Sequence, residues 1–180
     1  DLEPHQMIAM SLGLLPNIHP IPEELTDAIA RMPLAAPHIV GINISRGRIE
    51  TKLYFILRLA DLATLTPFVR DFGTPLLQKS WEHLVQKANI QARPTYELHL
   101  ALRLGNPTLG LKINPYVPDF FPDDESAFHY LENGFEALGL DREDLVAGRH
   151  LIEAQRTFPG RQLQFIGLGE SKFDLYFRPW

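Results

Sequence analysis

The chain is 180 residues long, with 45% hydrophobic and 22% charged residues, a formal net charge of −5 and no cysteine. This length suffices to bury the core of one domain. The absence of cysteine excludes disulfides, thiolate metal ligands and a cysteine nucleophile, and the acidic charge disfavours nucleic acid as a partner. The sequence shows no apolar run long enough to span a bilayer and no signal-peptide pattern, so we expect a cytoplasmic protein without a membrane partner.

The first forty residues predict two helices separated by a turn-rich loop. The segment HQMIAMSLGLL has a helical pattern that stops before Pro16. The second segment, PEELTDAIARM, starts with Pro22 and two acidic residues, which the dipole of a helix favours at its N-terminus. Pro33 ends this second helix.

Three antiparallel strand pairs follow, each joined by a short turn and each preceded by helical sequence. The strands are rich in β-branched and aromatic residues that alternate with period two. The predicted pairs are 38–45 with 48–58, 95–105 with 107–117, and 161–170 with 171–180. The helices between them are predicted at 64–87, with a break at Gly73-Thr74-Pro75, at 123–140 with an Asp123 or Asp124 cap, and at 141–154.

The strand TKLYF recurs as LKINP and FDLYF, with polar residues in the same slots. Tyr54 is followed by Asn114 after 60 residues and then by Tyr176 after a further 62 residues. Such a period indicates an architecture of repeated units. We therefore expect an α+β fold in a single domain, 1–180, built from three helix–hairpin repeats at about 1–60, 61–120 and 121–180.

Alternation assigns each strand an apolar face and a polar face. The apolar face, which includes Leu53 and Phe55, needs a cover that the amphipathic helices supply. The polar face has Gly110 and Gly167 leaving room among its larger side chains. Its predicted functional members are Lys52, Tyr54, Arg58, Glu97, His99, Arg103, Lys112, Asn114, Tyr116, Asp174, Tyr176 and Arg178. In an open sheet this face would simply be solvated, whereas in a barrel it would line a lumen.

The strand pairs GINISRGRIETKLYF and QFIGLGESKFDLYFRP resemble those of the ABBA aromatic prenyltransferases in length and polarity. The resemblance covers roughly residues 38–180 and rests on three Lys-x-Tyr-like strands in phase. It implies an antiparallel β-barrel or partial barrel with the helices outside and the active site in the lumen. That family has five helix–hairpin repeats and this chain offers three, so we expect an incomplete or shortened barrel.

The resemblance also assigns roles to individual residues. Lys52 matches a diphosphate-binding lysine and Tyr54 a tyrosine that shields the allyl cation. Lys112 matches the lysine slot of the next repeat, where Asn114 replaces the tyrosine. Fixed cations suit a diphosphate leaving group, and an aromatic face stabilises a cation without attacking it.

The third repeat departs further from the family pattern. Tyr176 matches a shielding tyrosine, but Asp174 replaces the lysine, and Arg178 lies two residues beyond on the same face. Strand alternation adds Arg58, Arg103 and Tyr116 as phosphate contacts, with Tyr116 also in the cation shield. It also adds Glu97 or His99 as the basic or acceptor-orienting group.

The resemblance therefore implies transfer of a dimethylallyl or longer isoprenyl group from an allylic diphosphate to an aromatic small molecule or peptide, a reaction of secondary metabolism. The segment PDDES is not the spaced DDxxD pattern that holds magnesium, and the seven histidines show no metal-ligand spacing. We expect no metal site and no required cofactor, although a single Mg²⁺ is compatible with the sequence. Two alternatives stay open: a non-catalytic module that binds a small molecule or peptide, and a subunit that completes its barrel as a homodimer.

Overall fold

A computed structural model describes most of the chain. The described residues are 23–31, 34–45, 48–90, 93–104, 110–138, 163–169 and 173–177, with Glu143, Val146, Arg149, His150 and Glu153. The helix predicted at residues 5–15 lies outside these ranges, as does Arg178. The fold is α+β, with one antiparallel sheet and several helices.

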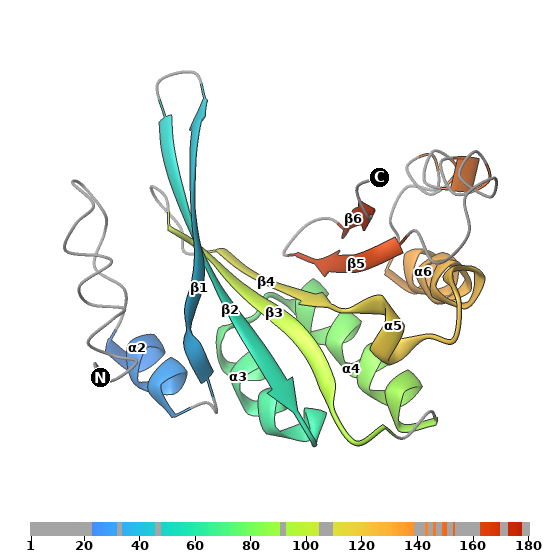
Figure 1. The fold of residues 1–180 in the computed structure, drawn as a ribbon, viewed down its shortest axis with the longest axis horizontal. Coiled ribbons are helices and arrows are strands. Elements are labelled where there is room, and N and C mark those ends of the chain that lie inside the picture. The colour runs from blue at the N-terminus through green and yellow to red at the C-terminus, as the bar shows by residue number, and fades with distance from the viewer. Residues whose placement is uncertain are drawn as a thin grey trace.

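The sheet has six strands in the order β1-β2-β3-β4-β5-β6, so each strand pairs with its neighbour in the chain (Figure 1). The strands are β1 (Leu34–Ser45), β2 (Arg48–Leu59), β3 (Tyr96–Leu104), β4 (Gly110–Pro115), β5 (Leu163–Leu168) and β6 (Phe173–Phe177). The three predicted hairpins are thereby confirmed. Within the described residues β1 and β6 form two edges of an open sheet, and closure into a barrel is not confirmed.

The helices occupy the segments between the hairpins. They are α2 (Glu23–Ala30), the 3-10 helix η1 (Leu62–Leu65), α3 (Thr66–Phe72), α4 (Pro75–Ile90), α5 (Val117–Phe120) and α6 (Asp124–Leu138). The predicted break at Gly73 is confirmed, because α3 ends before it and α4 begins at Pro75. Asp123 caps α6, since its Oδ1 accepts a hydrogen bond of 2.7 Å from the Ser126 N–H.

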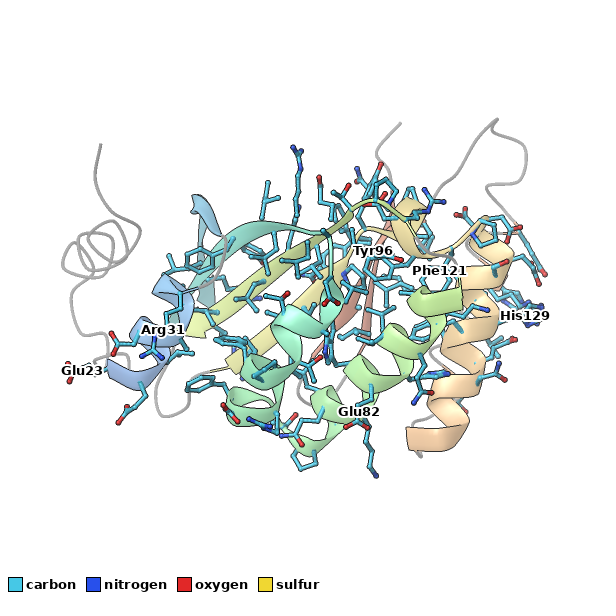
Figure 2. All side chains as sticks on the ribbon, turned by 90° about the horizontal axis from the view of Figure 1, so that it is seen from below. Glu23, Arg31, Glu82, Tyr96, Phe121 and His129 are labelled. Atoms are coloured by element: carbon cyan, nitrogen blue, oxygen red, sulfur yellow. The ribbon has the colours of Figure 1, made fainter. Side chains whose placement is uncertain are left out.

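Helices α3 and α4 lie across one face of the sheet, with α6 beside α4 (Figure 2). The leucines predicted for the apolar face are buried there, including Leu53, Leu98 and Leu100, each 0% exposed. The aromatic residues Trp81, Phe68 and Phe128 are also buried. The helices therefore seal one face of the sheet, and the opposite face carries the polar residues.

Candidate functional site

The polar face predicted from alternation is confirmed by burial in strand β2, and the register of β3 and β4 sets their predicted polar residues beside it. Its side chains are partly or fully exposed at Lys52, Tyr54 and Arg58, while their apolar neighbours in β2 are buried. Register pairing sets Lys52 opposite Arg103 and Arg58 opposite Glu97. Because paired residues project from the same side of a sheet, side chains of several strands meet in rows on this face.

One row joins a cation, a carboxylate and an imidazole at the end of the face nearest α5. Arg58 donates from Nε to Glu97 Oε2 at 3.2 Å, and His99 Nε2 lies 3.7 Å from Glu97 Oε1. The backbone N–H of Glu97 donates to Asp119 Oδ2 at 2.8 Å, which ties this strand to α5. Glu97 and His99 were predicted as alternative bases, and the structure places them in contact with one another.

The centre of the face is the Lys112 site, which comprises Lys112, Gly167, Asp174 and Tyr176. The Lys112 ammonium forms an ion pair with the Asp174 carboxylate and lies 2.5 Å from the Tyr176 hydroxyl oxygen. The same ammonium is 4.8 Å from the centroid of the Tyr176 ring. The side chains of Lys112 and Asp174 are only 20% and 30% exposed, so this pair is shielded more than a surface ion pair is.

Glycines on the polar face are crossed by cationic side chains of the neighbouring strand. A Cβ at Gly167 would lie 2.3 Å from Lys112 Cε, and one at Gly110 would lie 2.9 Å from Arg103 Nε. Both glycines were predicted to leave room on this face. The structure shows that Lys112 and Arg103 take up that room.

Phe165 belongs to this face and was not singled out from the sequence. Its ring lies between those of His99, at 4.5 Å, and Tyr116, at 5.2 Å. An irregularity in the pairing of β5 with β6, between Leu163 and Phe165, leaves Leu163 buried in the core while Phe165 is half-buried. The signal for this placement was the Phe165-Gly167 alternation, which puts Phe165 two residues before a polar-face glycine.

Asn114 is the most buried polar residue of the face, at 4% exposed. Its Nδ2 donates to the backbone carbonyl of His99 at 3.2 Å, whereas its Oδ1 is buried and accepts no hydrogen bond from the residues that the structure describes. Asn114 thus fixes β4 to β3 through its side chain.

The structure therefore places most of the predicted site residues on one face of the sheet, where they form separate clusters. Lys112, Asp174 and Tyr176 form one cluster, and Arg58, Glu97 and His99 form a second. Lys52 and Arg103 lie together toward the far end of the β2–β3 pair. Arg178 lies outside the described residues.

The described residues contain no group of three histidine, aspartate or glutamate side chains that is arranged to hold a metal ion. No helix among them has the length and apolar character needed to cross a membrane.

Comparison of the chain with models of protein families, with curated proteins and with solved structures finds no match.

Proposed function

We propose that the chain is an aromatic prenyltransferase unit whose polar face binds an allylic diphosphate and transfers its isoprenyl group to an aromatic acceptor. Four cations of this face, Lys52, Arg58, Arg103 and Lys112, are interleaved with Tyr54, Tyr116 and Tyr176. Fixed cations stabilise a departing diphosphate, and tyrosine ring faces stabilise an allylic cation.

The contact between Lys112 and Tyr176 carries this proposal. The Lys112 ammonium lies 2.5 Å from the Tyr176 hydroxyl oxygen, which places a cation at the edge of an aromatic ring on this face. A diphosphate bound by Lys112 would place its own allylic carbon within reach of the same ring. One site thus supplies the electrophile's anchor and the aromatic surface for the cation.

The reaction requires three changes of bonding. The bond between the allylic carbon and the diphosphate oxygen breaks, and the diphosphate leaves with the electron pair toward the cations. An aromatic carbon of the acceptor then forms a bond to the allylic carbon. The resulting arenium ion loses a proton to Glu97 or His99, whose side chains lie 3.7 Å apart.

The architecture that we propose around this site is a partial barrel. The open sheet curls so that its polar face becomes concave, and further strands pair with the edges β1 and β6. Within the described residues β1 is a 12-residue strand that pairs on one side only, with β2. Open edges of this length readily accept another strand.

The second candidate function, a subunit that completes its barrel by dimerisation, also follows from the β1 edge. Sedimentation velocity over a hundredfold range of protein concentration tests it directly. A dimer whose formation protects the amides of β1 from hydrogen exchange would support this candidate. A monomer at all concentrations would contradict it.

Calorimetric titration with dimethylallyl thiolodiphosphate, with and without Mg²⁺, tests the main proposal. We expect magnesium-independent binding that Lys52→Ala and Lys112→Ala each weaken by about 1.5–3 kcal/mol, the range for hydrogen bonds to charged groups. Lys79→Ala is the matched control, because Lys79 is an exposed lysine on α4, in the helical layer. No binding at millimolar ligand, or equal losses in all three variants, would contradict the proposal.

A further inference from the structure

The Lys112 ammonium already has an anionic partner and a hydroxyl partner when no ligand is bound. Lys112 contacts the Asp174 carboxylate and the Tyr176 hydroxyl, and its side chain passes over Gly167 to reach them. This reach depends on the absence of a side chain at residue 167, because a Cβ there would lie 2.6 Å from Lys112 Nζ. The sequence thus provides both the carboxylate and the path to it.

Both side chains of the Lys112–Asp174 pair are shielded from water. Side-chain exposure is 20% for Lys112 and 30% for Asp174, compared with 74% for Arg58 in the pair Arg58–Glu97. Screening by water and salt weakens an exposed pair strongly and a shielded pair much less. Of these two ion pairs, Lys112–Asp174 therefore holds its cation more firmly.

We infer that Asp174 competes with the diphosphate for Lys112. An incoming diphosphate must displace Asp174 from this pair, and Asp174 pairs with Lys112 again when inorganic diphosphate leaves. This inference rests on the proposed function and adds a specificity-determining residue to it. Asp174 lowers the affinity of the site for anions, because part of the binding free energy is spent on breaking its pair with Lys112. The benefit is faster release of the inorganic diphosphate product.

A double-mutant cycle tests the inference, using Asp174→Asn, Lys112→Ala and the combined variant. The ligands are dimethylallyl thiolodiphosphate and inorganic diphosphate, titrated by calorimetry. We expect Asp174→Asn to tighten the binding of both ligands by roughly 5- to 50-fold, which is the range between an exposed ion pair and a charge-assisted hydrogen bond. In the Lys112→Ala background, Asp174→Asn should give little or no gain.

Asp71→Asn is the matched control, because it makes the same chemical change at an exposed carboxylate on α3, in the helical layer. It should leave both affinities unchanged, and circular dichroism should show that every variant is folded. A gain that survives in the Lys112→Ala background would mean that Asp174 acts by general repulsion, which overturns the inference.

The outcomes also separate this inference from the proposed function. If the wild type binds the thiolodiphosphate and Asp174→Asn gives no gain, the inference alone fails. If only Asp174→Asn binds, the wild-type chain fails the test of the proposed function, and the inference that rests on that function fails as well. If neither protein binds either ligand, the proposed function fails and the inference fails with it.

Discussion

The Tyr176 hydroxyl oxygen lies 2.5 Å from Lys112 Nζ, while the centroid of its ring is 4.8 Å from the same atom. The Lys112 ammonium thus contacts the hydroxyl edge of the ring and not its face. The roles of the hydroxyl group and of the ring are separable by substitution, since phenylalanine keeps the ring and leucine removes it.

Substitution at Tyr176 therefore tests the cation shield of the proposed enzyme. We expect Tyr176→Leu to lower kcat for prenyl transfer by roughly 2- to 30-fold, since a cation–π contact is worth about 0.5–2 kcal/mol. Tyr176→Phe should retain most of the activity. Single-turnover assays that follow both transfer and hydrolysis of the allylic diphosphate measure the difference. Equal losses in the two variants would assign the role to the hydroxyl group.

Gly167→Ala tests the path of Lys112 to Asp174. The added Cβ would lie 2.3 Å from Lys112 Cε, so the side chain must leave its pair with Asp174. The added Cβ would also lie 3.0 Å from Asn114 Oδ1, so we expect the free energy of unfolding to fall by roughly 0.5–3 kcal/mol, the usual range for a destabilising substitution. The gain in diphosphate affinity from Asp174→Asn should shrink in this background. A full gain would mean that Lys112 reaches Asp174 by another route.

Gly134→Ala, in α6, is the control for this substitution. A Cβ at Gly134 meets no atom closer than His83 Nδ1 at 3.8 Å, so alanine fits without rearrangement. Alanine in a helix interior stabilises by roughly 0.5–1 kcal/mol relative to glycine. We expect this gain in denaturant unfolding and no change in diphosphate binding.

The stability of the protein should fall in mildly acidic solution because of His83. Burial, followed by the charge of Lys87, lowers the pKa of His83 from its usual value of 6.5. Between the lowered folded pKa and the unfolded value of 6.5, the unfolded chain binds more protons than the folded one. The contribution of His83 to the free energy of unfolding is thus fully present above pH 6.5. It is lost as the pH falls from 6.5 to the lowered pKa of the folded state.

Thermal unfolding of the wild type and of His83→Gln between pH 5 and 8 checks this expectation. The difference in Tm between them should shift in favour of the variant as the pH falls below about 6.5. His83 also stacks on Tyr130 with 4.7 Å between ring centroids, so the variant has a constant loss at all pH values. A difference that does not depend on pH would contradict the assignment.

Loss of the cap at α6 should destabilise the helix that flanks α4. Asp123→Ala removes the acceptor for the Ser126 N–H, and we expect a cost of about 1 kcal/mol, the typical value for an N-cap. Asp123→Asn keeps an oxygen at this position and should cost much less. Urea denaturation of both variants measures the difference, and equal costs would show that the charge matters rather than the cap.

Strand positions and faces were predictable from the sequence because they depend on local patterns. Period-two alternation located the hairpins, and the same alternation separated Leu53 from Lys52. Gly73 and Pro75 marked the break between α3 and α4 because neither suits a helix interior. The predicted strand 107–117 was extended beyond Pro115, because Pro118 was not used as a helix-start signal. In the structure α5 begins at Val117.

The pairing within the site was not predictable because it depends on register between distant segments. The contact of Lys112 with Asp174 joins residues 62 apart in the chain. One residue of slip between β4 and β5 would move the partners of Lys112 to the opposite face. The irregularity between Leu163 and Phe165 likewise has no local signal, although it separates the buried Leu163 from the half-buried Phe165.

Trp81 gives the most direct test of the helical layer that covers the sheet. It is 1% exposed, and its Nε1 donates to Thr66 Oγ1 at 3.1 Å, which joins α4 to the first residue of α3. Trp81→Ala should cost about 3–5 kcal/mol, since it leaves a large cavity.

Thr66→Val separates the hydrogen bond of Trp81 from its packing. It keeps the shape of residue 66 but leaves the buried indole N–H unsatisfied, so we expect a cost of about 1–3 kcal/mol. In the Trp81→Phe background, which has no N–H to satisfy, the same substitution should cost clearly less. Denaturant unfolding of the four proteins measures this coupling. If Thr66→Val costs the same in both backgrounds, Trp81 contributes through packing alone.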